Sequence, residues 1–320
     1  MVLKVGFIGV GGVANSHLDH LTQIKGVKIA ALCDVVEEKL RVAQKKYGGN
    51  IYTDYKEMLD KERLDCVYVC VPPFAHADIE LDIAQRNIPF FIEKPVNLYL
   101  EKGREVEKVI KEKNLITSVG YVLRYMDIIE KAKKILEEKK IALLLGRYFG
   151  EIPAAGEGWY SRREKSGGQI VEQATHVIDL MRYLVGEVDQ IYAQGFTGLN
   201  KLKNYNVEDA SIATLHFKKG AIGTLSSTWL LWSYFPSLEI ITKGLHLQLS
   251  ISSLKVISPD KEEEFQAKND YALLEDRVFI EAVKSGNSSN IKSDYSDGLK
   301  TLKVTLAANE SMKKQRVIKL

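Results

Sequence analysis

Two hydrophobic rhythms divide the chain. Up to about residue 121, short apolar runs alternate with segments whose apolar residues recur every three to four positions. Strands that alternate with amphipathic helices predict βαβ units and a parallel sheet with right-handed crossovers. Asp54 is the expected N-cap of the third helix. The expected strands lie within 3–10, 27–34, the start of 51–61, 64–72, 88–94 and 115–122, and the helices within 14–24, 36–48, the end of 51–61, 75–87 and 99–114.

The rhythm changes after residue 121. A charged helix over 126–139, a strand over 143–152, a loop rich in Gly, Trp and Arg, and a helix over 170–185 come first. From Val188 to Ile257, successive strands with short turns predict an antiparallel sheet. Two helices, 270–285 and 294–314, close the chain. We therefore predict an α/β protein with two domains, residues 1–121 and 122–320, as its length also favours.

Composition narrows the class of protein. Of 320 residues, 45% are hydrophobic, which is typical of a globular protein, and no apolar run is long enough for a membrane helix. A net charge of +3, spread along the chain, favours neither nucleic acid nor a membrane surface as partner. Cys33, Cys66 and Cys70 lack the spacing of a disulfide framework or a zinc site. We expect buried free thiols, a cytoplasmic location and no metal.

A glycine-rich loop follows the first strand. Gly9, Gly11 and Ala14 have the spacing of a dinucleotide-binding turn, with Gly12 and Val13 between them, and a helix follows. Gly9 permits the tight turn, Gly11 lets the backbone approach a pyrophosphate, and Ala14 allows close helix packing. The start of the helix offers unpaired N–H groups to the phosphates. The loop therefore predicts a dinucleotide site.

An acidic residue ends the second strand. Asp34 lies 25 positions after Gly9, where a carboxylate accepts from both ribose hydroxyls. Val35 and Val36 follow it, so a 2′-phosphate would meet a carboxylate and no cation. We therefore predict NAD rather than NADP. The alternative is that Asp34 only caps the following helix.

Lys94 follows a buried strand in the run FFIEKPV. Ligands of an open parallel sheet bind beyond the carboxyl ends of its strands, and Pro72 and Pro73 turn the chain at that same edge. A lysine there can donate to the oxygen of a substrate alcohol or carbonyl. The positive oxidised ring and partial desolvation would lower its pKa. The alternative is a solvated surface lysine.

The helix over 170–185 has two distinct faces. Glu172 and His176 are one turn apart, so the carboxylate can hold one ring nitrogen and leave the other as a base. The glycines before the helix leave room for a substrate. The alternative is an exposed stripe with a helix salt bridge. The apolar face comprises Val171, Ala174, Ile178, Met181 and Val185, and the opposite stripe Glu172, His176, Asp179 and Tyr183.

These motifs together resemble the Gfo/Idh/MocA family, the group of glucose–fructose oxidoreductase and inositol dehydrogenase, over essentially the whole chain. The shared stretches are GVGGVA, VCVPPFAH, EKP at 93–95, VGYVLRY at 119–125, GG…EQATHVIDLMRYL at 167–184 and TLKVTLAANES. The resemblance implies a Rossmann domain, a second α/β domain with a large open sheet, and nicotinamide-dependent oxidation or reduction of sugar- or polyol-like alcohols. Lys94 falls on the family's active-site lysine and His176 on its catalytic histidine. Positions that line the cofactor are Val71, Pro72, His76 and Glu93.

The chain departs from the family pattern at two positions. Glu172 stands where the family usually has Asp, and Leu123 where it often has Arg, which makes inositol itself a less expected substrate. Other side chains are candidates to contact a polyol. These are Tyr121, Trp159, Tyr160, Arg162, Arg163 and Asp179.

The mechanism expected from these residues is oxidation of a secondary alcohol of a sugar, inositol or related polyol. His176 takes the hydroxyl proton with help from Glu172, Lys94 donates to the same oxygen, and the ring takes the hydride. The sequence does not distinguish which of Lys94 and His176 accepts the proton and which donates to the oxygen. The resemblance and the apolar run STWLLWSYF also predict a homodimer or homotetramer through the C-terminal sheet.

Two other functions fit the same residues. One is an NAD-dependent glycosidase-type elimination, in which the sugar is oxidised only transiently and no net NADH forms. The other is a catalytically silent NAD-binding regulator, against which the presence of both Lys94 and His176 argues.

Overall fold

The computed structural model describes residues 2–76, 78–153 and 158–320, which form two compact units. The first unit comprises residues 1–121 and 272–299, and the second 122–271 and 300–320. The chain leaves the first unit after residue 121, as predicted. The predicted second domain, 122–320, is corrected, because residues 272–299 return to the first unit. The reason is packing: Leu273, Phe279 and Ile280 are buried in the core of the first unit.

The first unit contains a six-stranded parallel sheet in the order β3-β2-β1-β4-β5-β6. The chain reverses its winding between β1 and β4, so this is the switch point at which open α/β sheets bind ligands. The strands are β1 Leu3–Ile8, β2 Val27–Cys33, β3 Asn50–Tyr52, β4 Cys66–Val69, β5 Phe90–Ile92 and β6 Thr117–Val119.

Helices pack on this sheet as the apolar periodicity predicts. The core around Phe7, Tyr68 and Phe91 also takes in apolar side chains of α1, α2 and α10. Asp54 caps α3, because its side chain accepts from the N–H of Lys56. The helices are α1 Gly12–Thr22, α2 Glu37–Tyr47, α3 Tyr55–Lys61, α4 Ile79–Gln85, α5 Leu100–Lys113 and α10 Tyr271–Ser285, with a 3-10 turn, η1, at Pro73–Ala75.

The second unit contains a nine-stranded sheet in the order β14-β13-β12-β11-β7-β10-β9-β8-β15. All neighbours are antiparallel except β7 and β10, which confirms a large, mostly antiparallel sheet. The sequence did not predict β14 and β15. The strands are β7 Ile141–Glu151, β8 Val188–Phe196, β9 Ala210–Phe217, β10 Ile222–Thr228, β11 Leu230–Thr242, β12 Leu245–Leu249, β13 Ser253–Ser258, β14 Lys261–Gln266 and β15 Ile318–Lys319.

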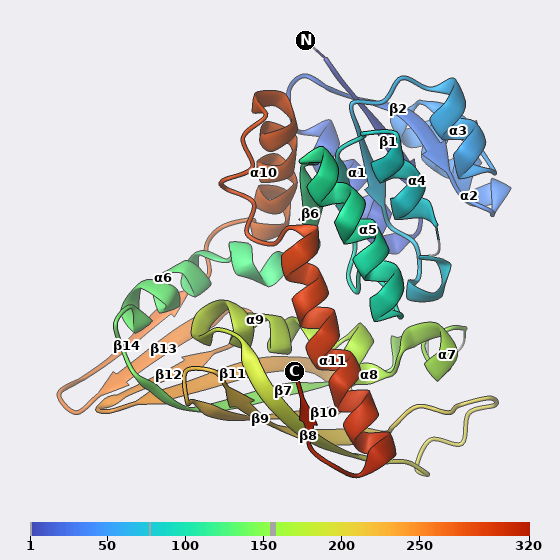
Figure 1. Ribbon diagram of the computed structural model, residues 1–320. Coiled ribbons are helices and arrows are strands. Elements are labelled where there is room, and N and C mark those ends of the chain that lie inside the picture. Colours follow the sequence, from blue (N-terminus) through green and yellow to red (C-terminus); the bar gives the residue numbers. More distant parts are fainter. Residues whose placement is uncertain (1, 77, 154–157) are drawn as a thin grey trace. The chain divides into compact units, whose positions relative to one another are not determined.

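Helices α6 and α9 lie over one face of this sheet, as Figure 1 shows, and pack into its core. The boundary between the units falls within α11, at residues 299 and 300. Among the described residues, none of the helices has the length and apolar character to cross a membrane. The helices are α6 Asp127–Leu136, α7 Arg163–Ser166, α8 Gln169–Glu172, α9 Thr175–Val185 and α11 Tyr295–Lys314, with a 3-10 turn, η2, at Val122–Tyr125.

The helix predicted over 170–185 is corrected to two helices, α8 and α9. The chain departs from regular helix at Gln173, with φ −111° and ψ −58°. Here Ala174 N–H donates to the carbonyl of Gln169, five residues back. The sequence around Gln173 contains no Gly or Pro that would indicate the break. The helical spacing of apolar residues therefore predicted one continuous helix.

Candidate active site

Five strands of the first unit end along one edge of the sheet. Backbone hydrogen bonds continue past the strand ends and hold the following residues in line. They run from Gly9 N–H to Cys33 O at 2.8 Å, from Cys70 N–H to Ile8 O at 2.8 Å, from Glu93 N–H to Val69 O at 2.9 Å and from Gly120 N–H to Ile92 O at 2.9 Å. The glycine loop, the segment after β4 and Glu93 therefore share one edge.

The glycine loop has the shape that a dinucleotide needs. Gly9 has φ +87°, and a Cβ there would lie 2.3 Å from the carbonyl oxygen of Cys70, so only glycine fits. A Cβ at Gly11 or Gly12 would meet no atom within 4 Å. Ala14 is buried and Val13 is 55% exposed. The start of α1 therefore faces open space into which a diphosphate fits.

Asp34 organises the turn beside this loop. Its Oδ2 accepts from Val10 N–H at 2.9 Å, and its Oδ1 accepts from Val36 N–H at 3.0 Å. The N-cap of α2 is Val36, so Asp34 is not the capping residue of that helix. A carboxylate has about four acceptor sites, so two stay available for ribose hydroxyls. Val35 is 87% exposed and places no cation beside the carboxylate.

Lys94 follows β5 at the same edge and is half-buried. The Lys94–Pro95 peptide is cis. The Lys94 N–H donates to Oε2 of Glu93 at 3.2 Å, and Nε2 of His17 lies 3.0 Å from Oε1 of Glu93. A Cβ at Gly120 would lie 2.6 Å from the same Oε1. The Glu93 carboxylate is therefore held on three sides, directly beside Lys94.

The segment after β4 places its predicted residues differently. Val71 and Pro72 are half-buried next to the loop, and η1 begins at Pro73. The His76 side chain is fully buried and pairs through Nδ1 with Glu80 of α4, four residues later. The His76 ring is therefore buried in this structure, and its place beside the cofactor stays a prediction.

Glu172 and His176 belong to the second unit and flank the break between α8 and α9. Glu172 ends α8 and is 5% exposed, and His176 lies in the first turn of α9 and is half-buried. The assumption that both sit one turn apart on a continuous helix is therefore wrong. The predicted apolar face is confirmed, because its five residues are buried. The opposite stripe is not a solvated face, since two of its members are buried as well.

Asp179, a predicted substrate contact, lies in the interior of the second unit. Arg124 of η2 grips it in a bidentate ion pair, and Thr301 Oγ1 of α11 donates to Asp179 Oδ1 at 2.9 Å. Asp179 is 1% exposed. These contacts make Asp179 the counter-ion of Arg124. Leu123, which stands where the family often has Arg, precedes Arg124 in the chain and is a core residue.

Of the remaining substrate candidates, Tyr121 belongs to the first unit, and the others belong to one segment of the second unit, residues 159–163. Tyr121 is 1% exposed at the end of the first unit. Trp159 stacks on Tyr160 with ring centroids 3.8 Å apart. Arg162 is half-buried before α7, and Arg163 pairs with Glu208. Residues 154–157 of the same loop lie outside the described residues.

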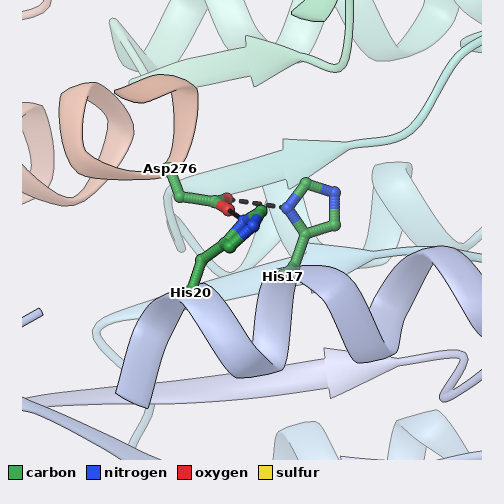
Figure 2. Close-up of side chains that lie close together, drawn as sticks. All are labelled: His17, His20 and Asp276. Carbon is green, nitrogen blue, oxygen red and sulfur yellow. Dashed lines mark hydrogen bonds and ion pairs between the residues drawn. The ribbon is translucent and has the colours of Figure 1, made fainter. Parts of the chain in front are cut away.

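The structure also brings together polar groups that sequence reasoning missed. Tyr148 on β7 donates to Oε1 of Gln173 at the helix break, and burial raises the pKa of Tyr148. In the first unit, His17 and His20 of α1 both contact Asp276 of α10, as Figure 2 shows. The H-x-x-H spacing in α1 was a visible signal, but nothing in the sequence pointed to its partner. The three cysteines are free thiols, with Cys70 only half-buried.

Comparison with known proteins extends the resemblance over both units. Two family models match, one described as an oxidoreductase family with an NAD-binding Rossmann fold, over residues 3–121, and one as a GFO/IDH/MocA C-terminal domain, over residues 129–244. Myo-inositol 2-dehydrogenase of Thermotoga maritima is 26% identical, over 99% of this chain and 98% of its own. The scyllo-inositol 2-dehydrogenase (NAD(+)) of Bacillus subtilis is 25% identical, over 99% and 96%.

Among solved structures, levoglucosan dehydrogenase in complex with NADH and L-sorbose has the same fold. The TM-score is 0.91 at 21% sequence identity, over 100% of this chain and 99% of that one. Both sheets and their order of connection are therefore shared with a protein that holds a nicotinamide cofactor.

Proposed function

Because the chain belongs to the Gfo/Idh/MocA oxidoreductase family, we propose that it is an NAD-dependent dehydrogenase of secondary alcohols in sugars, inositols or related polyols. One observation carries the proposal: the glycine loop and Lys94 share a single edge of the Rossmann sheet. A lysine next to a dinucleotide site has a chemical use that a lysine on a solvated face lacks. The names of the inositol and levoglucosan dehydrogenases support the substrate class.

The first unit would hold the cofactor through the backbone N–H groups of the glycine loop and through the carboxylate of Asp34. The loop at Gly9, Gly11 and Gly12, with the start of α1, suits the diphosphate, and Asp34 suits the ribose. When bound, the nicotinamide ring supplies the hydride chemistry. The Asp34 carboxylate, which Val35 and Val36 follow in the chain, would repel a 2′-phosphate, and this favours NAD over NADP.

Two side chains would handle the proton of the alcohol. Lys94 donates a hydrogen bond to the alcohol oxygen and stabilises negative charge that develops there, and His176 accepts the proton. The reverse assignment is equally compatible with a half-buried lysine and a half-buried histidine. Glu172, at the end of α8, would orient His176 across the helix break. Trp159 and Arg162 would contact the polyol.

The deciding experiment is a screen of NAD⁺ and NADP⁺ reduction over sugars, inositols, sugar acids and aromatic dihydrodiols. Net NADH formation supports the proposal and excludes glycosidase-type elimination, which returns the hydride. Bound NAD without turnover on any substrate would favour the silent regulator. With an active substrate, pH–rate profiles of Lys94→Ala and His176→Ala identify the proton acceptor. Near-normal turnover of both variants would refute the site assignment. Lys102→Ala and His246→Ala are matched controls, since Lys102 is exposed and His246 lies on β12.

We further propose that two copies associate through the C-terminal sheet. Apolar side chains stay exposed on three strands of this sheet. Ile212 on β9 and Ile222 on the neighbouring β10 are about half exposed, and Trp232 on β11, beyond β7, is 85% exposed. Several exposed apolar side chains on one sheet are typical of an interface. A homodimer or a homotetramer would cover them. A cytoplasmic location is an expectation from the free thiols.

A further inference from the structure

His17 lies between two carboxylates in the interior of the first unit. Its Nδ1 is 2.7 Å from Oδ1 of Asp276, and its Nε2 is 3.0 Å from Oε1 of Glu93. The exposed fraction of the three side chains is 7% for His17, 0% for Asp276 and 15% for Glu93. A neutral imidazole has one N–H and can donate to only one carboxylate. With both carboxylates ionised, both contacts are hydrogen bonds only when His17 carries two protons and a positive charge.

The surroundings of His17 favour this charged form. Burial lowers the pKa of His17, but the charge of Asp276 and hydrogen bonds to Asp276 and Glu93 outweigh it and raise the pKa well above 6.5. Burial raises the pKa of Asp276, but the charge of His17 and hydrogen bonds from His17 and His20 lower it overall. Tyr68 and Cys70 also face the cluster, and burial raises the pKa of both, so they are neutral.

A metal ion explains the same cluster less well. His17, His20 and Asp276, drawn in Figure 2, offer ligand atoms that lie within 4.8 Å of one another. Two ligands at zinc distances in a tetrahedral site would lie about 3.3 Å apart. The two N···O distances to Asp276 are both 2.7 Å, which is a hydrogen-bond length. A shared proton therefore accounts for each contact.

We propose that His17 is a positioning residue of the cofactor edge: a buried imidazolium that fixes the Glu93 carboxylate beside Lys94, with Asp276 of α10 as its counter-ion. Residues 272–299, which belong to the first unit, would then have a functional role, because they contain Asp276, the counter-ion of His17. The effect on NAD rests on the proposed function, whereas the charge state of His17 does not.

The loss of the imidazolium has a defined consequence. In His17→Gln, the amide has no charge to pair with Glu93, and its NH₂ group reaches one carboxylate at most. Hydrogen bonds to charged groups contribute more free energy than neutral ones. If Glu93 moves away from the cofactor edge, the affinity for NAD should therefore fall about tenfold or more. Because His17 does not touch the alcohol, the KM for the alcohol should change far less than the affinity for NAD.

The charge state is tested on the wild-type full chain by ¹⁵N NMR of the histidine rings. At about pH 8, well above the ordinary histidine pKa, both nitrogens of His17 should carry protons. A single-proton His17 would overturn the proposal. Addition of Zn²⁺ should leave the His17 signals unchanged, and their replacement by zinc-bound signals would also overturn it. Glu93→Gln should lower the pH at which His17 loses its second proton, because it removes one of the two carboxylates that stabilise the imidazolium, and an unchanged value would contradict the proposed pairing.

The positioning role is tested by calorimetric titration with NAD. His17→Gln and Asp276→Asn should each weaken binding about tenfold, and the double variant should be little worse than either, because the residues act as a unit. His246→Gln should bind as the wild type does. Unchanged affinity in His17→Gln would refute the positioning role. If the wild type binds no NAD, the proposed function fails, while the NMR result still decides the charge of His17.

Discussion

Arg124 and Asp179 form a bidentate ion pair in the interior of the second unit. Nε of Arg124 lies 2.7 Å from Oδ2 and Nη2 lies 2.6 Å from Oδ1, and the side chains are 4% and 2% exposed. Thr301 adds a third donor to the same carboxylate. The pair therefore joins η2, α9 and α11, three elements that are distant in the sequence.

Asp179→Asn should destabilise the protein strongly, because it leaves the Arg124 guanidinium buried without its counter-ion. The expected loss is about 3–5 kcal/mol in the free energy of unfolding. Urea denaturation followed by circular dichroism measures it. Glu37→Gln, in the exposed pair with Arg41, should cost less than about 1 kcal/mol. A loss in Asp179→Asn no greater than in Glu37→Gln would contradict the structural role.

Substitutions of two loop glycines should separate folding from cofactor binding. Gly9→Ala should destabilise the first unit by about 1–3 kcal/mol, because its Cβ collides with the Cys70 carbonyl and φ is positive. Gly11→Ala should fold normally, since its Cβ meets no protein atom, but should weaken NAD binding. Thermal unfolding and calorimetry measure the two effects. Wild-type NAD affinity in Gly11→Ala would place the phosphates elsewhere.

Asp34 should determine the choice between NAD and NADP. Asp34→Ala removes the carboxylate that a 2′-phosphate would meet, so the ratio of kcat/KM for NAD over NADP should fall by about tenfold or more. It also removes two acceptors of backbone N–H groups, so the affinity for both cofactors should decline. Asp19→Ala, on the outer part of α1, is the control. An unchanged ratio would show that another group reads the ribose.

The sequence predicted the fold and the cofactor edge because their signals are local. Strand and helix periods, the glycine spacing and Asp34 all lie within short stretches. The pairing of His17 with Asp276 spans 259 positions and has no local signal. The break at Gln173 was not predicted, because no Gly or Pro, the residues that disfavour a helix most, lies near it. Strand β14 was missed because KEEEFQ is charged, as exposed edge strands often are.

Trp232 should report on self-association. It is 85% exposed on β11, and Phe235 on the same strand is 57% exposed. If a second copy covers this surface, Trp232→Lys should shift sedimentation from a dimer or tetramer toward smaller species. Val42→Lys should not, although Val42 is 67% exposed, because it lies on α2 of the first unit. A wild-type protein that sediments as a monomer would remove the proposed interface.

The charge on His17 should make stability depend on pH in one direction. Its folded-state pKa lies above the unfolded value of 6.5, so its contribution is fully present below pH 6.5 and is lost as the pH rises through the folded-state pKa. The difference in unfolding free energy between wild type and His17→Gln should therefore be largest below pH 6.5. Above that pH it should shrink by about 1.4 kcal/mol per pH unit until the folded-state pKa is reached. Urea titrations of both proteins across this range measure it. A difference that grows with pH would mean that His17 is buried in its neutral form.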